Sequence, residues 1–192
     1  MNLIRAFIAV EIDLSNKEKL SKLISQLKKS NADIKWLSEN QMHFTLKFLG
    51  NIEENKVSLI SDTLRSIAAQ VHEFTLTLSN IGAFPNMRKP RVIWIGVDKG
   101  AEDLKLLAAK IEKGLEKLGL EQEKRDYKAH LTLGRVRSSK NISNLTDIVH
   151  KIKPDLKDGA KIKKVILFKS VLTGKGAIYT PLSELNLRIS CV

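Results

Sequence analysis

Two short segments of the chain repeat one local pattern, and this repeat constrains the fold more than any other feature. Residues 40–50 read NQMHFTLKFLG and residues 128–137 read KAHLTLGRVR, so a His-x-Thr-x motif begins at His43 and again at His130. Because side chains alternate between the two faces of a β-strand, each motif would direct its His and Thr to one face and its apolar residues to a core. The sequence therefore predicts two similar strands, each presenting a His and a Thr.

The segments around the motifs alternate between helical and extended patterns. Helices are expected over residues 15–30, 53–71, 101–119 and 142–153, and strands over residues 3–12, 34–37, 42–50, 74–84, 91–97 and 129–136, with two more within 161–187. Ser15 and Glu18 have the spacing of a capping box for the first helix. The order of elements predicts an α+β fold with mostly antiparallel strands. No linker-like stretch divides the chain, so residues 1–192 are expected to form one domain with an internal structural duplication.

Charge and cysteine content narrow the class of protein. The formal net charge is +12, which fits a Lys-rich solvated surface and an anionic partner, most often nucleic acid, equally well. The single cysteine, Cys191, excludes an internal disulfide and fits a reducing compartment. The apolar N-terminal run is broken by Arg5 and Glu11 and is too short to span a membrane. We therefore expect a cytoplasmic protein without membrane association.

The paired motif suits phosphodiester chemistry if its residues converge. One neutral imidazole can take a proton from an attacking hydroxyl or water, and the other, as imidazolium, can protonate the leaving oxygen. The hydroxyls of Thr45 and Thr132 can donate to phosphate oxygens. A histidine on a strand is more often structural, and His72 and His150 are interpreted that way. The repetition of the pattern favours acid–base catalysis by the other two.

Rival chemistries have less support in the sequence. There is no HExxH motif, and no carboxylate shares the expected face of the motifs, so no metal site is expected. The glycine spacings of nucleotide-binding loops are absent, and no cofactor is expected. Strict alternation would place Lys47 beside the motif residues and Phe48 in the core. Trp94 is also expected in the core, and Phe84 in a loop.

Several segments together resemble one superfamily. The segments RAFIAVEI (residues 5–12), HFTLKFLG (43–50), GAFPNMRKPRVIWIGV (82–97) and HLTLGRVR (130–137) resemble the two-histidine phosphoesterases, and within them the RNA 2',3'-cyclic phosphodiesterases, also called the 2'-5' RNA ligase family. The resemblance implies a bilobal α+β fold. In it, two pseudo-twofold-related lobes with mostly antiparallel sheets would face a central positively charged cleft, with the helices outside.

The resemblance also implies an activity and residue roles. The activity would be metal-independent hydrolysis of a terminal 2',3'-cyclic phosphate of RNA to a 2'-phosphate. His43 would protonate the leaving 3' oxygen, His130 would be the general base on water, and Thr45 and Thr132 would bind the phosphate. Arg135 matches a family arginine near the cleft. Alternation alone points it away from His130, so this role requires a bend or bulge in the strand.

The expected partner is RNA with 2',3'-cyclic phosphate ends, with tRNA fragments among the candidates, and no obligate protein partner is evident. Arg5 and Arg91 are further candidates for contact with RNA or for plain surface charge. One alternative function is RNA 2'-5' ligation, which uses the same acid and base with a 5'-hydroxyl as nucleophile. Another is a non-catalytic module that binds RNA or nucleotides. The intact His and Thr in both motifs argue against the second alternative, because binding alone needs no matched acid and base.

Overall fold

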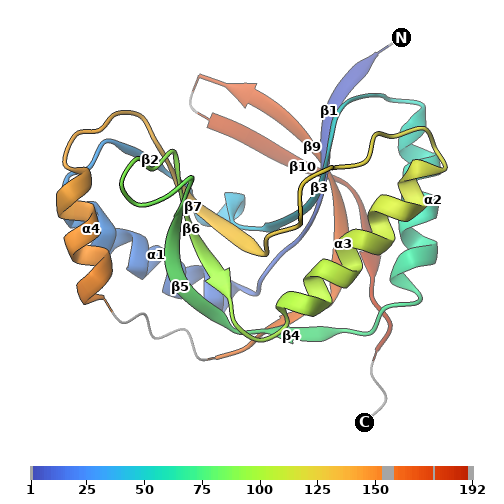
Figure 1. The fold of residues 1–192 in the computed structure, drawn as a ribbon. Coiled ribbons are helices and arrows are strands. Elements are labelled where there is room, and N and C mark those ends of the chain that lie inside the picture. The colour runs from blue at the N-terminus through green and yellow to red at the C-terminus, as the bar shows by residue number, and fades with distance from the viewer. Residues whose placement is uncertain (1, 153–157, 175, 190–192) are drawn as a thin grey trace.

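The computed structural model describes residues 2–152, 158–174 and 176–189, and it confirms the α+β class (Figure 1). The helices are α1 (Leu14–Leu27), α2 (Lys56–Ala68), α3 (Ala101–Glu116) and α4 (Ile142–Lys151). The strands are β1 (Leu3–Val10), β2 (Ile34–Trp36), β3 (Phe44–Glu53), β4 (Phe74–Leu76), β5 (Leu78–Phe84), β6 (Val92–Val97), β7 (His130–Val136), β8 (Ala160–Ile162), β9 (Lys164–Thr173) and β10 (Gly176–Asn186). Cys191 lies outside the described residues, as does Lys175 of the Gly174-Lys175-Gly176 turn that the sequence predicts between its last two strands.

One antiparallel sheet organises the molecule. Its strands follow the order β10-β9-β1-β3-β7-β6-β5, and the short β2 also pairs with β7. The expected single strand over residues 74–84 is wrong: it is divided into β4 and β5, and β4 pairs with β8 in a separate two-stranded sheet. The two motif strands, β3 and β7, are neighbours at the centre of the large sheet.

The helices form two pairs that mix the first and second halves of the chain. Helices α2 and α3 pack on each other and against the half of the sheet that includes β3. Helices α1 and α4 contact each other at the opposite end of the molecule (Figure 1). Each pair therefore takes one helix from each half of the sequence, which means that neither half builds a complete lobe alone. Within the described residues, no helix is long and apolar enough to cross a membrane.

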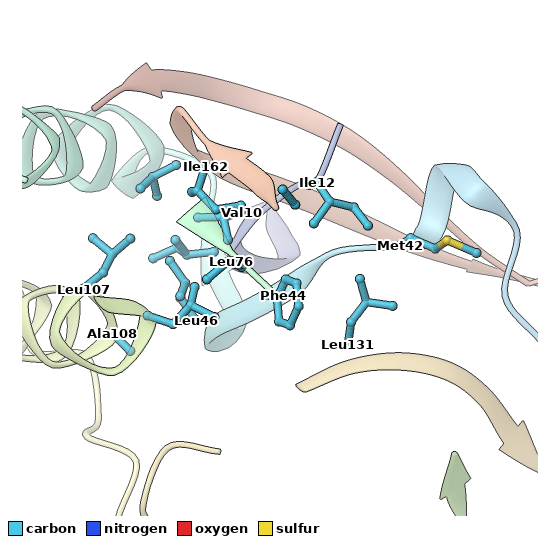
Figure 2. Close-up of a cluster of buried hydrophobic side chains, with 14 of the residues drawn as sticks. Val10, Ile12, Met42, Phe44, Leu46, Leu76, Leu107, Ala108, Leu131 and Ile162 are labelled. Atoms are coloured by element: carbon cyan, nitrogen blue, oxygen red, sulfur yellow. The ribbon is translucent and has the colours of Figure 1, made fainter. Parts of the chain in front are cut away.

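The core runs through the point where the two motif strands meet. Phe44 of β3 and Leu131 of β7 are both fully buried, and they lie among other apolar side chains such as Val10 and Met42 (Figure 2). Full burial of a side chain of this size contributes about 2 kcal/mol from removal of apolar area from water. The apolar residues of the motifs therefore anchor both strands on a shared core, as the alternating pattern predicts.

The residues that cap two helices show where the sequence predicts a helix end correctly and where it does not. Helix α1 is capped by Asp13, whose side chain accepts a hydrogen bond from the backbone N–H of Asn16 at 2.9 Å, so the capping box expected from Ser15 is wrong. Asp13 has the extended backbone that an N-cap requires. After α3, Gly119 has a φ of 73°, the left-handed conformation in which glycine commonly ends helices.

Candidate active site

The two motifs meet through equivalent residues. Phe44 pairs with Leu131 across β3 and β7, and each of these residues directly follows the histidine of its motif. An antiparallel pair in which equivalent positions face each other has a local twofold axis between them. The same register would set His43 opposite Thr132 and Thr45 opposite His130. The motif strands are thus neighbours in one sheet, and their His and Thr side chains gather around the axis on one face, here called the motif face.

Aromatic rings enclose the imidazole of His43. It stacks on Phe7 of β1 with ring centroids 4.9 Å apart, and it meets Tyr179 of β10 edge-on at 5.2 Å. Burial lowers the pKa of His43 to about 4, despite a hydrogen bond to the backbone carbonyl of Gln41 that acts in the opposite direction. The positive charges of Lys17 and Arg135 lower it further.

His130 has a matching environment on the other side of the axis. Its ring meets Phe84 edge-on at 4.8 Å and Trp94 at 6.3 Å. Burial and the charge of Arg135 lower its pKa below the ordinary value, against a hydrogen bond to the carbonyl of Lys128. The Nδ1 atom lies 2.7 Å from that carbonyl oxygen.

The two histidines therefore share one local arrangement. Each ring donates to the carbonyl of the residue two positions before it, Gln41 for His43 and Lys128 for His130. At His130 this bond holds the proton on Nδ1 and leaves Nε2 free to face a ligand. Both pKa values are lowered, so both imidazoles are neutral in the free protein at neutral pH.

Each threonine lies two residues after the histidine of its own motif and opposite the histidine of the other motif. Thr45 and Thr132 are half-buried, and Thr132 pairs with Trp94 of β6. Trp94 was expected in the core, but it is half-buried against His130 on the motif face. Gly82 of β5 allows this position, because a Cβ atom there would lie 2.3 Å from the ring of Trp94. The structure thus brings His43, Thr45, His130 and Thr132 together.

A bulge in β7 supplies the change of face that Arg135 requires. Ile93 of β6 pairs with Gly134, whereas the next residue, Trp94, pairs with Thr132, so Leu133 is the extra residue. Arg135 is exposed beyond this bulge. Its charge lowers the pKa of both His43 and His130. The guanidinium therefore acts on both sides of the local axis, although simple alternation points it away.

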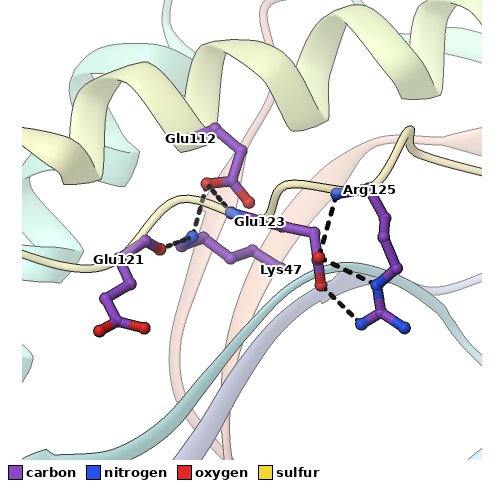
Figure 3. A network of polar contacts seen from close by, with 5 residues as sticks. All are labelled: Lys47, Glu112, Glu121, Glu123 and Arg125. Atoms are coloured by element: carbon purple, nitrogen blue, oxygen red, sulfur yellow. Dashed lines mark hydrogen bonds and ion pairs between the residues drawn. The ribbon is translucent and has the colours of Figure 1, made fainter.

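Two irregularities in β3 overturn two expectations from alternation. The pairing with β1 skips Leu46 and then Leu49, so the faces exchange after Thr45. Lys47 consequently points away from the motif face into the interior, where its Nζ lies 2.5 Å from a carboxylate oxygen of Glu112 and 2.7 Å from the carbonyl oxygen of Glu121 (Figure 3). Phe48 was expected in the core. It is 67% exposed, and its ring centroid lies 6.2 Å from that of Phe7.

The Lys47 contacts help to position the segment that leads into the second motif. Glu112 belongs to α3, and its carboxylate also accepts a hydrogen bond from the backbone N–H of Glu123 at 3.4 Å. Glu123 in turn binds Arg125 through both carboxylate oxygens (Figure 3). One buried cation therefore ties the first motif strand to the connection that precedes His130.

Some residues around the histidines carried no signal in the sequence. Phe7, Lys17 and Tyr179 come from β1, α1 and β10, and only the folded structure brings them to His43. Arg5, an uncertain candidate from sequence, lies close enough to Tyr179 to lower its pKa, although burial raises that pKa overall. Arg91, the other candidate, lies beside the end of β7 opposite to His130, where its carbonyl oxygen accepts a hydrogen bond from the backbone N–H of Val136 at 2.9 Å. The described residues contain no group of three or more His, Cys, Asp or Glu side chains that could hold a metal ion.

A twofold-related pair of His-x-Thr-x strands at the centre of an α+β sheet defines the class of two-histidine phosphoesterases. Comparison with protein families gives the particular family. The model described as "LigT like Phosphoesterase" matches residues 10–94 and again residues 95–179, so the chain belongs to the LigT-like phosphoesterase family. The two matches also support the internal duplication that the repeated motif predicts.

Curated relatives and solved structures agree with this assignment. A protein of Archaeoglobus fulgidus is 38% identical over 178 residues, and the match covers 93% of this chain and 97% of that protein. A protein of Methanocaldococcus jannaschii is 35% identical over 181 residues, and the match covers 94% of this chain and 99% of that protein. Both are named RNA 2',3'-cyclic phosphodiesterase. The fold matches a crystal structure of a Thermus thermophilus protein with a TM-score of 0.81 at 24% identity, covering 98% of this chain and 100% of that one. It also matches Escherichia coli LigT complexed with 3'-AMP, with a TM-score of 0.77 at 22% identity, covering 97% and 99%.

Proposed function

We propose that the protein hydrolyses 2',3'-cyclic phosphate ends of RNA to 2'-phosphates, with its two motif histidines as acid and base and without a metal ion. The observation that carries this proposal is the pairing of Phe44 with Leu131, because it relates the two His-Thr sets by a local twofold axis. Attack on phosphorus with departure on the opposite side needs two proton-transfer groups, one at each side. A twofold pair of histidines supplies them.

The proposed reaction breaks one P–O bond and forms one. Water attacks the phosphorus while a neutral imidazole accepts its proton, and the bond from phosphorus to the 3' oxygen breaks as an imidazolium gives that oxygen a proton. The phosphate stays on the 2' oxygen. Thr45 and Thr132 would donate hydrogen bonds to the non-bridging oxygens, and Arg135 would offset their negative charge.

The family resemblance makes His43 the proton donor and His130 the base, and the electrostatics of the free protein add a condition. A histidine whose pKa is about 4 is neutral at pH 7 and has no proton to give. The cyclic phosphate is an anion, and an anion beside an imidazole raises its pKa. Binding of the substrate would therefore favour protonation of the histidine that acts as the acid.

The decisive experiment incubates the purified protein with an RNA that ends in a 2',3'-cyclic phosphate, in the presence of EDTA. We expect hydrolysis, and we expect the product phosphate to resist a phosphatase specific for 3'-phosphates and to give the phosphorus NMR signal of a 2'-phosphate. Activity lost in EDTA and restored by one metal ion would overturn the metal-free mechanism. A 3'-phosphate product would reverse the proposed orientation of the substrate. Joining to an added RNA with a 5'-hydroxyl, in preference to hydrolysis, would identify a ligase.

The lowered pKa values also predict how the rate depends on pH. One histidine must be neutral and the other protonated, so kcat/KM should be bell-shaped and should report the coupled pair in the free enzyme. Both pKa values lie below 6.5, that of His43 at about 4, so the maximum of kcat/KM should fall below pH 6.5. Above this maximum the acid loses its proton, and below it the base gains one.

The profile of kcat describes the enzyme with substrate bound, and its maximum should lie at higher pH because the bound phosphate raises both pKa values. Rates measured between about pH 4 and 9, with a short RNA substrate at low and saturating concentrations, give both profiles. If the maxima of kcat/KM and kcat lie at the same pH, substrate binding does not raise the pKa of the histidine that acts as the acid. A kcat/KM maximum at alkaline pH would contradict the lowered pKa values themselves.

A further inference from the structure

A concave surface lies at the end of β7 opposite to His130. It is a cavity of about 1210 Å³ between three segments: the loop of residues 86–91 that joins β5 to β6, residues 137–139 after β7, and α4. None of the four motif residues lines it. We call this surface the basic groove, because Arg88, Lys89, Arg91 and Arg137 line it.

Within the described residues, the charges of the basic groove are not paired with acids, and the turn that carries two of them has a fixed backbone. All four side chains are exposed, and none of them takes part in the ion pairs found within the described part of the chain. Among the described residues that line the groove, Asp147 is the one acidic residue. The side chain of Asn86 accepts hydrogen bonds from the backbone N–H groups of Arg88 and Lys89, at 3.0 and 3.1 Å, which fixes the turn that carries them.

Part of the remaining lining is also suited to phosphate, and the rest of it is formed by apolar side chains such as Met87, Pro90 and Ile142. Hydroxyl side chains contribute to it from the segment after β7 and from α4, namely Ser138, Ser139, Ser143 and Thr146. Such hydroxyls, together with Arg and Lys, are the side chains that most often contact the phosphates and sugars of nucleic acids. The lining that the structure describes contains no Phe, Tyr or Trp, so it offers contacts to a sugar-phosphate backbone rather than stacking platforms for bases.

Strand β7 connects the groove to the candidate active site. Arg137 directly follows β7 and lies two residues after Arg135, whose charge lowers the pKa of both histidines. At about 3.3 Å per residue, Arg137 lies roughly 20 Å along the strand from His130. Arg135 and Arg137 therefore lie between the motif residues and the basic groove. The distance between these two sites corresponds to the length of a few nucleotides.

We propose that the basic groove binds the sugar-phosphate backbone of the substrate RNA, several nucleotides before the terminal phosphate that reacts at the histidines. This inference rests on the proposed function for the identity of the substrate. It adds that affinity for long RNA comes largely from a surface remote from the chemistry, and that the enzyme prefers single-stranded ends long enough to reach it.

The test removes two charges from the groove and compares the effect with the same loss elsewhere. The groove variant is the double substitution Arg88→Ala and Lys89→Ala. The control is Lys110→Ala with Lys117→Ala, which removes two exposed lysines from the α3 end of the molecule. Each protein is assayed on adenosine 2',3'-cyclic phosphate and on an oligonucleotide of about ten residues with a 2',3'-cyclic end, a length within the range of single-strand binding sites.

Loss of two phosphate contacts should raise KM for the oligonucleotide about 25-fold at about 0.1 M salt, because each contact contributes a factor of about five through counterion release. The groove variant should leave kcat and KM for adenosine 2',3'-cyclic phosphate unchanged, and the control should leave both substrates unchanged. Fluorescence anisotropy with a labelled oligonucleotide that ends in a 2'-phosphate should show the slope of log affinity against log salt reduced by about 1.4.

The outcomes separate the two proposals. A wild-type protein that hydrolyses neither substrate overturns the proposed function, while the anisotropy measurement still reports on the groove. A protein that hydrolyses both substrates, with the groove variant indistinguishable from the control in KM and in anisotropy, overturns the groove as an RNA site and leaves its charge for another partner, such as an acidic protein. An equal rise in KM for both substrates would show that the loop acts on the active site itself.

Discussion

Replacing His43 or His130 with alanine should lower kcat/KM by about 10²–10⁴-fold, because each variant loses one of the two proposed proton transfers. The double variant should be little worse than the poorer single variant, since an acid and a base that serve one step act as a unit. Initial rates on a 2',3'-cyclic phosphate substrate measure both effects. The matched control is His72→Ala, which removes an exposed histidine from between α2 and β4 and should keep the wild-type rate.

Stability must be followed in the same variants, because both rings pack against aromatic side chains. His43 stacks on Phe7, and His130 meets Phe84, so the alanine variants lose packing as well as a titrating group. Thermal unfolding will show whether the fold persists at the assay temperature. A variant that is folded and retains the wild-type rate removes that histidine from the mechanism.

A modified substrate assigns the roles of acid and base. If the 3' oxygen of the cyclic phosphate is replaced by sulfur, the leaving group is a thiolate, whose low basicity makes a proton donor unnecessary. The variant that lacks the acid should recover most of its rate on this substrate, and the variant that lacks the base should not. The family resemblance predicts recovery for His43→Ala. Recovery for His130→Ala instead would exchange the roles, which the lowered pKa of His43 would then explain.

The parts of the fold that depend on local sequence patterns could be predicted from the sequence. The helical stripes predicted four helices close to their observed bounds, and the apolar residues of the two motifs predicted a shared core at Phe44 and Leu131. Alternation also placed each motif His and Thr on one face. These predictions hold because the period of a helix or strand is an intrinsic property of the backbone.

The details that depend on pairing between strands did not follow from the sequence. A bulge moves every later side chain of its strand to the opposite face, and no glycine or proline marks the one at Leu46, so Lys47 and Phe48 were assigned to the wrong faces. The bulge in β7 has a weak signal in Gly134, where β2 approaches so closely that a Cβ atom would lie 2.7 Å from Ile34. Contacts such as Phe7 and Tyr179 with His43 join distant strands, and a single sequence carries no record of them.

Arg135→Ala should lower kcat/KM by about 10²–10³-fold, the usual effect of removing one group that stabilises developing negative charge. The bulge at Leu133 turns the arginine toward the motif face, and its charge already lowers the pKa of both histidines in the free protein. The same charge should stabilise the phosphate oxygens as water adds. Arg135→Lys should recover part of the rate, because lysine keeps the charge but loses the planar donor fork of arginine.

If Arg135 had only a structural role, its removal would leave the pKa values of the two histidines unchanged. Removing the positive charge of Arg135 should raise the pKa of His43 and of His130 together, and NMR titration of the imidazole protons measures both. Arg65→Ala, which removes an exposed arginine from α2, should change neither the rate nor these pKa values. If Arg135→Ala lowers the rate and leaves both pKa values in place, the arginine acts on the substrate from a position remote from the histidines. If it leaves the rate unchanged, the bulge does not bring Arg135 into the reaction, and the phosphate charge is met by the threonines and by other cations near His43, such as Lys17.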